Sequence, residues 1–184
     1  DEYPRIINPS HGRIWTANAR ITDGPDLDKL GWGYYALGAR QQQIRDALFA
    51  QQDFTEEDFL TLQLDDRAIF LQRWQRLLLQ NIDLAEQPQW AELQREVNQW
   101  QGRASKTSVG YRAVKEFREA VIDQTVGSIY RQLMASTDNF DPEWASNRLE
   151  YPVWSLLSQQ PEAHIPAGFN SWDDFISAMI EETL

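Results

Sequence analysis

Residues 108–135 read SVGYRAVKEFREAVIDQTVGSIYRQLMA, and they form the longest periodic stretch of the chain. Side chains suited to a core recur there three or four positions apart, which is the spacing of one face of an α-helix. The members of this face are Val114, Phe117, Val121, Thr125, Ile129 and Leu133. The stretch therefore predicts one long amphipathic helix, and it indicates a mainly helical fold.

Shorter helices are predicted on the N-terminal side of this stretch. The first begins near Ala39. A capping sequence at residues 55–58 then precedes a short helix, and a longer helix follows it and ends at about Ile82. These two helices are joined near residues 65–66. Another helix starts at Pro88, because proline suits the first helical position. Its apolar face consists of Trp90, Leu93, Val97 and Trp100, and Gly102 ends it.

Three further pieces are predicted on the C-terminal side. A short one opens at residues 141–143, and another turn or two of helix starts at Pro152. Residues 170–174 carry Asn, Ser and two aspartates, which are typical of a helix N-terminus. They predict a last helix whose apolar face consists of Phe175, Met179 and Ile180.

The N-terminal residues 5–18 predict a β-hairpin. Arg5–Ile7 and Arg13–Ala17 contain strand-forming side chains, and Asn8–Gly12 between them contains the turn formers Asn-Pro and Gly. Two strands alone are marginal in water, so their unpaired edges would let a second copy of the chain pair there. The expected fold is mainly α, with this short hairpin and an irregular stretch in residues 1–38 and a helical domain in residues 39–184.

Composition narrows the classes of function. The chain has 184 residues and a formal net charge of −11, so it lacks the basic surface that nucleic acids or anionic membranes require. It has no cysteine, which excludes disulfides, thiolate nucleophiles and Cys-ligated metals. No apolar run is long enough to span a bilayer. The chain starts without methionine or a signal peptide, and we expect it to be an excised or processed piece of a longer protein.

Most polar side chains of possible catalytic type have simple structural interpretations. The only two histidines, His11 and His164, lie in turn-rich sequence, so we interpret both as exposed loop residues. Acidic residues occur in adjacent pairs, and neighbours on a helix do not face each other. Helix capping or a solvated face therefore explains them better than a catalytic dyad. The aromatic residues at helical spacing are interpreted as core.

The N-terminal segment contains the sequence Asn8-Pro9-x-x-Gly12-x-Ile14-x-Thr16-Ala17-Asn18-x-Arg20. It resembles a segment near the middle of the β chain of penicillin acylases, a family that includes glutaryl, cephalosporin and acyl-homoserine-lactone acylases. The stretch from Gly31-Trp32-Gly33 to Ala39-Arg40 resembles the aromatic and glycine-rich approach to an arginine at a helix start. Weaker similarities are Leu60-x-x-x-Leu64-Asp65 and Trp100-Gln101-Gly102, where glutamine replaces the aspartate of the family.

The resemblance implies an N-terminal nucleophile hydrolase. Such enzymes cut their own precursor, and the new N-terminal serine attacks the substrate amide with its own α-amine as the base. The resemblance assigns Asn18 as an oxyanion donor, a role that suits a neutral side-chain amide. It assigns Arg40 as the residue that braces the site, which suits a permanently charged planar group. The alternative for Asn18 is an ordinary turn asparagine.

The nucleophile itself is missing, because Asp1 comes first and Ser10 and Ser105 are internal. We therefore expect the chain to be inactive alone and to need the remainder of the acylase, namely its α chain and the rest of the β chain. The resemblance also implies acyl-amide substrates and a periplasmic or secreted location. It implies a bound calcium ion as well, whose ligands lie mainly in sequence absent here, with Asp26 or Asp28 as the candidate ligand in this chain. The competing hypothesis is a free-standing helical interaction module with an aromatic surface away from Asn18.

Overall fold

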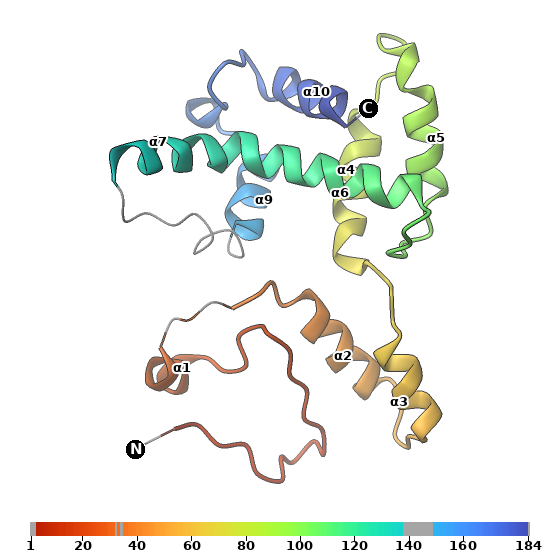
Figure 1. Ribbon diagram of the computed structural model, residues 1–184, viewed down its shortest axis with the longest axis vertical. Coiled ribbons are helices and arrows are strands. Elements are labelled where there is room, and N and C mark those ends of the chain that lie inside the picture. Colours follow the sequence, from red (N-terminus) through yellow and green to blue (C-terminus); the bar gives the residue numbers. More distant parts are fainter. Residues whose placement is uncertain (1–2, 32, 34, 138–148, 184) are drawn as a thin grey trace. The chain divides into compact units, whose positions relative to one another are not determined.

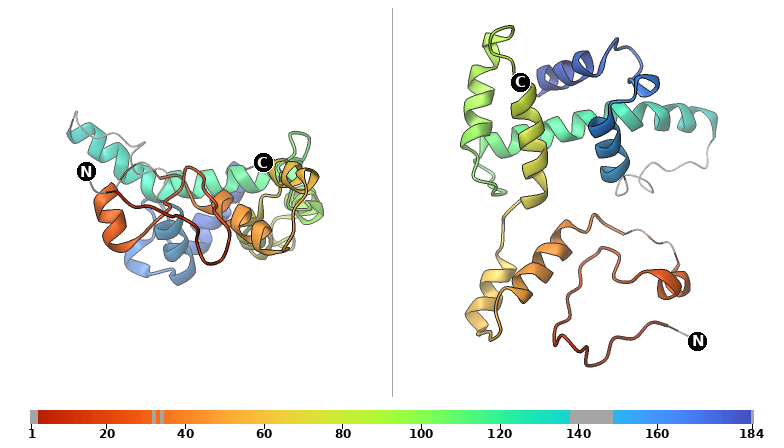
Figure 2. Two further views of the ribbon diagram at one scale, coloured as in Figure 1. Left: turned by 90° about the horizontal axis from the view of Figure 1, so that it is seen from below. Right: turned by 180° about the vertical axis from the view of Figure 1, so that it is seen from behind.

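The computed structural model describes residues 3–31, 33, 35–137 and 149–183. These residues form two compact units (Figures 1 and 2). The N-terminal unit comprises the described residues up to Asp65, and the helical unit comprises those from Asp66 onwards. The predicted boundary between residues 38 and 39 falls inside the N-terminal unit.

The N-terminal unit consists of an irregular segment followed by three helices. Residues 3–22 contain no helix or strand, and α1 (Gly24–Leu30), α2 (Ala39–Phe49) and α3 (Glu56–Gln63) follow. The start of α2 agrees with the sequence prediction. The predicted cap of α3 is confirmed as well, because Thr55 and Asp58 form a reciprocal capping box. Donation from the backbone N–H and the hydroxyl of Thr55 lowers the pKa of the Asp58 carboxyl.

The predicted β-hairpin is not present in the described residues. Its turn forms, because Gly12 N donates to Pro9 O at 2.8 Å and Gly12 has a φ of 67°, but the two flanking segments do not pair. Their apolar side chains are largely exposed; those of Ile6, Ile7 and Ile14 are 62%, 73% and 59% exposed. Two short strands without a sheet bury too little surface to hold a ladder, which explains the difference.

The helical unit is built around α6 (Val109–Ile122), which packs against α4 (Gln72–Asn81), α5 (Ala91–Gln99), α9 (Glu150–Gln159) and α10 (Trp172–Glu182) (Figures 1 and 2). Short helical turns precede three of these helices. They are η1 (Ile69–Leu71), η2 (Pro88–Trp90) and η4 (Glu162–His164). The mainly helical class and these predicted helices are thereby confirmed, whereas the piece predicted at residues 141–143 lies outside the described residues.

The long helix predicted over residues 108–135 exists, but one π-helical turn interrupts it. This turn, η3 (Asp123–Gly127), separates α6 from α7 (Ser128–Ser136). Thr125 lies buried in it and donates from Oγ1 to Val121 O at 2.7 Å. A side-chain hydroxyl that donates to a carbonyl of the preceding turn commonly disturbs the regular backbone hydrogen bonds of a helix. The spacing of apolar residues does not reveal such a disturbance.

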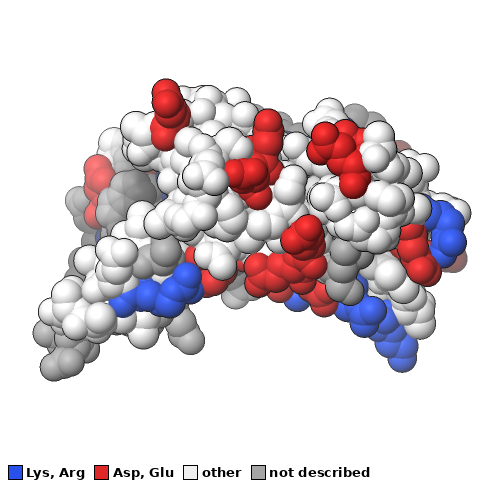
Figure 3. All heavy atoms as spheres, turned by 90° about the horizontal axis from the view of Figure 1, so that it is seen from above, with Lys and Arg blue, Asp and Glu red and all other residues white. Residues whose placement is uncertain are grey.

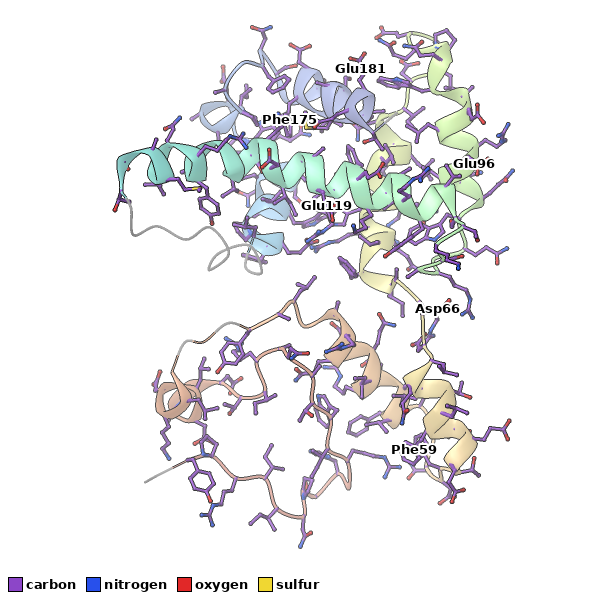
Figure 4. All side chains as sticks on the ribbon, in the orientation of Figure 1. Phe59, Asp66, Glu96, Glu119, Phe175 and Glu181 are labelled. Carbon is purple, nitrogen blue, oxygen red and sulfur yellow. The ribbon has the colours of Figure 1, made fainter. Side chains whose placement is uncertain are left out.

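The core of the helical unit is aromatic. Trp74, Trp90, Phe117 and Phe175 are almost fully buried, and Phe175 lies between α10 and α6 (Figure 4). The ring centroids of Trp74 and Phe117 are 6.2 Å apart in an edge-to-face arrangement. Each such side chain contributes about 1.5–3 kcal/mol by leaving water. On the face drawn in Figure 3, Asp and Glu side chains cover more of the surface than Lys and Arg side chains do, in line with the negative net charge.

One buried acid sits beside this core. Glu150, 5% exposed, accepts from Trp74 Nε1 at 2.6 Å and from Arg118 Nε at 2.7 Å, and Arg73 donates to the same carboxylate. Burial alone raises the pKa of Glu150, but donation from Arg73, Trp74 and Arg118 outweighs it, so the net effect is a lowered pKa. We call these four residues the Glu150 cluster.

The crossing of α5 and α6 requires glycine at position 110. A Cβ at Gly110 would lie 2.3 Å from the carbonyl oxygen of Glu96 and 2.8 Å from Cβ of Trp100. We expect Gly110→Ala to destabilise the chain by about 1–3 kcal/mol, because backbone atoms must move to admit the methyl group. Urea unfolding followed by circular dichroism measures this.

The matched control is Gly38→Ala, whose added Cβ would come no closer than 4.0 Å to Ala19. We expect that change to alter the free energy of unfolding by less than about 0.5 kcal/mol. Equal effects of the two substitutions would contradict the close approach of α5 and α6.

Candidate functional site

Asn18 and Arg40 are brought together in the N-terminal unit. Arg40 Nη2 donates to Asn18 Oδ1 at 2.5 Å, and both side chains are exposed. The backbone of the same segment is attached to the residues around the start of α2. Ala36 N donates to Asn18 O at 2.9 Å, and Gln41 Nε2 donates to Arg20 O at 3.3 Å. Three hydrogen bonds thus hold residues 18–20 against this helix start.

The contact with Arg40 determines how the Asn18 amide is oriented. A guanidinium group has donors and no acceptor, so only the carbonyl oxygen of the amide can face it. The NH₂ group of Asn18 must then point away from Arg40. No described residue accepts a hydrogen bond from that NH₂ group. The geometry therefore leaves both N–H donors of Asn18 without an acceptor among the described residues.

A second arginine anchors the same segment to the other end of α2. Arg13 donates from Nε to Leu48 O at 3.1 Å, and from Nη2 to Gln51 O at 3.3 Å and Gln52 O at 2.6 Å. The last carbonyls of a helix lack partners within the helix, and a cation is favoured beside them. We call this interaction the Arg13 cap. It serves a helix that ends at Phe49 and Ala50 without a glycine.

Three aromatic rings cluster at the same end of α2, where Phe49 is the last helical residue. The ring centroids of His11, Trp15 and Phe49 lie 5.4–5.7 Å from one another, in tilted and edge-on arrangements. His11 is exposed, as predicted. Sequence analysis assigned no role to Arg13. The signal that could have found it is a helix that lacks a glycine stop, since such a helix needs another partner for its carbonyls.

The remaining candidates behave as ordinary structural residues. His164 is exposed in η4, as predicted. The acidic pairs Glu56–Glu57 and Asp173–Asp174 lie in the first turns of α3 and α10, which confirms their interpretation as helix-capping charges. Asp26, considered for calcium, instead lies 3.6 Å from Lys29 Nζ. Within the described ranges, no group of three or more His, Asp and Glu side chains could hold a metal ion.

The sequence matches the penicillin amidase family over residues 1–180. The chain belongs to the penicillin amidase family. Membership implies that the full-length protein is an amide hydrolase. Comparison with curated proteins and with solved structures found no significant match.

As a penicillin amidase chain, the molecule is mainly helical, and the two candidate site residues, Asn18 and Arg40, lie in direct contact. No helix in the described part of this chain has the length and apolar character needed to cross a membrane.

Proposed function

We propose that this chain supplies part of the active site of an amidohydrolase that cleaves acyl-amide bonds. In this proposal Asn18 donates to the oxyanion of the tetrahedral intermediate, and Arg40 holds the Asn18 amide in its donating orientation. The observation that carries the proposal is the 2.5 Å hydrogen bond from Arg40 Nη2 to Asn18 Oδ1.

The chemistry explains why these two residue types suit the task. Attack on an amide carbonyl places negative charge on its oxygen, and donors that are already aligned stabilise that charge most effectively. The NH₂ group of Asn18 is such a donor and does not titrate. Arg40 polarises the amide through Oδ1, which strengthens the remaining N–H donors. Its permanent positive charge also favours a nearby oxyanion.

The nucleophile in this proposal lies outside the 184 residues. Every serine of the chain, Ser10 and Ser105 included, is linked by peptide bonds on both sides, so none carries the free α-amine that would serve as its base. An N-terminal serine from the remainder of the acylase would attack the acyl carbon and pass its proton through the α-amine to the leaving amine. Water would then hydrolyse the acyl-serine ester and release a carboxylic acid.

The substrates we propose are linear acyl amides of the β-lactam side-chain or acyl-homoserine-lactone type, and the proposed location is periplasmic or secreted. Calcium, which the family resemblance implies, would be held by residues outside the described part of this chain. The alternative of a free-standing interaction module is less favoured. Four of the tryptophans that motivate it, Trp74, Trp90, Trp100 and Trp172, are buried, and its aromatic surface would have to come from exposed residues such as Phe49, Phe59 and Tyr151.

The decisive experiment compares the full gene product with residues 1–184 alone, using phenylacetyl and fatty-acyl amides as substrates and amine release as the readout. We expect turnover by the full protein and a covalent acyl-serine intermediate that mass spectrometry detects. The isolated chain should release no amine. Turnover by the isolated chain would rule out an external nucleophile, and a full protein that never acylates would rule out the proposed reaction.

A further inference from the structure

A groove in the helical unit lies between one face of α4 and one face of α9. Its lining consists of Arg73, Arg76, Leu77, Gln80, Trp154, Leu157 and Ser158. The α4 residues have the i, i+3, i+4, i+7 spacing of a single helix face, and the α9 residues have the i, i+3, i+4 spacing. The groove has a volume of about 270 Å³. All of its residues belong to the helical unit, whereas Asn18 belongs to the N-terminal unit.

The polar side of this groove is positively charged in a strongly acidic chain. Its lining contains two arginines and no Asp or Glu. Arg76 is exposed and makes no ion pair with any residue that the structure describes. Most other exposed arginines of the helical unit do have acidic partners, for example Arg95, Arg112 and Arg131.

Arg73 is anchored by two contacts, and 32% of its side chain remains exposed. Its guanidinium carbon lies 4.4 Å from the ring centroid of Trp154, and its Nη2 donates to Glu150. Its Nε is buried without an acceptor among the described residues. Glu150 also pairs with Arg118, so one carboxylate is shared by two guanidinium groups and the cluster retains positive charge. Arg76 adds a further positive charge one helical turn away.

The apolar side of the groove indicates the size and the apolar character of the rest of the ligand. Leu77, Leu157 and the Trp154 indole offer surface for a ring or a short chain. A cavity of about 150 Å³ is large enough to bind benzene, so this groove has room for one ring with a short acidic arm. A carboxylate matches the planar fork of an arginine better than a spherical ion does.

We propose that the groove between α4 and α9 binds a small organic monocarboxylate. Arg76 and Arg73, whose side chain is 32% exposed, take the carboxylate, while the apolar body lies against Trp154, Leu77 and Leu157. The site is independent of the proposed amide hydrolysis, because none of its residues belongs to the Asn18 region.

A titration of the 184-residue chain with 3-phenylpropionate tests this, followed by NMR of the Leu77 and Leu157 methyl groups. We expect saturable shifts of these methyls. The neutral analogue 3-phenylpropanamide should bind about tenfold more weakly, since it lacks the charge-assisted bonds. Added salt should weaken binding of the acid but not of the amide.

The variant Arg76→Gln isolates the charge. We expect it to weaken 3-phenylpropionate binding about tenfold without changing the fold, because Arg76 is exposed and has no partner in the described part of the chain. Arg112→Gln is the matched control, since Arg112 is exposed on α6 outside the groove, and it should leave the affinity unchanged. Absence of saturable shifts, equal affinity for acid and amide, or an unchanged affinity in Arg76→Gln would each overturn the proposal.

Discussion

Replacement of Asn18 by alanine is expected to lower kcat of the full amidohydrolase by about 10²–10³-fold, the usual effect of removing one oxyanion donor. The reason is that the Asn18 amide, oriented by Arg40, would no longer meet the developing negative charge. KM should change much less, because the charge develops mainly in the transition state. Steady-state kinetics with a chromogenic acyl amide measure both constants.

Two further variants make this result specific. Asn18→Asp keeps an acceptor for Arg40 but replaces the donor with a carboxylate, so we expect it to be at least as inactive as Asn18→Ala. Asn98→Ala removes an exposed asparagine on α5 and should leave kcat unchanged. If Asn18→Ala retained the parental kcat, Asn18 would be a turn residue and not an oxyanion donor.

The second large effect is expected on stability. Glu150→Gln should destabilise the helical unit by about 3 kcal/mol, because it removes the negative charge shared by Arg73 and Arg118 in a buried position. The glutamine NH₂ would also face donors instead of acceptors. Urea unfolding, followed by tryptophan fluorescence, measures the loss as a lower midpoint at constant slope.

The control for this substitution is Glu119→Gln on α6. Glu119 is paired with Lys115 at 3.1 Å, but its side chain is 52% exposed, so we expect a loss below about 0.5 kcal/mol. Figure 4 labels this residue. A Glu150 variant no less stable than the Glu119 variant would contradict a stabilising role for the Glu150 cluster.

The same cluster predicts a dependence of stability on pH. The pKa of Glu150 in the folded chain is lowered from its ordinary 4.5, so the unfolded chain takes up this proton at a higher pH than the folded chain does. The contribution of Glu150 is therefore complete above the ordinary pKa and is lost as pH falls through the lowered one. In Glu150→Gln this part of the acid sensitivity should disappear.

Local patterns were enough to predict most of the helices. Periodic apolar residues predicted α6 and α10, and the capping residues Thr55 and Ser171 do accept the expected backbone N–H groups. The hairpin prediction was wrong because strand propensity at residues 5–17 says nothing about whether a sheet is available to pair with. The π turn at residues 123–127 was missed because apolar spacing does not report hydrogen-bond register.

Contacts between distant residues were harder to predict. Arg13 and its acceptors are 35 to 39 positions apart, and Glu150 is 77 positions from Arg73. No spacing rule connects such pairs, because the fold alone brings them together. Asn18 and Arg40, 22 positions apart, were assigned to one site only through the family resemblance.

The Arg13 cap also fixes the distance that the segment from residue 13 to residue 18 has to span. Residues 13 and 18 are attached to opposite ends of α2, whose eleven residues rise about 16 Å. The five steps from residue 13 to residue 18 reach at most about 17 Å when fully extended. The two spans are therefore similar, so the segment runs extended alongside α2, and the long side chains of Arg13 and Arg40 supply the remaining reach at its two ends. Shortening either side chain should loosen residues 13–18 from the helix more than changing the residues between them.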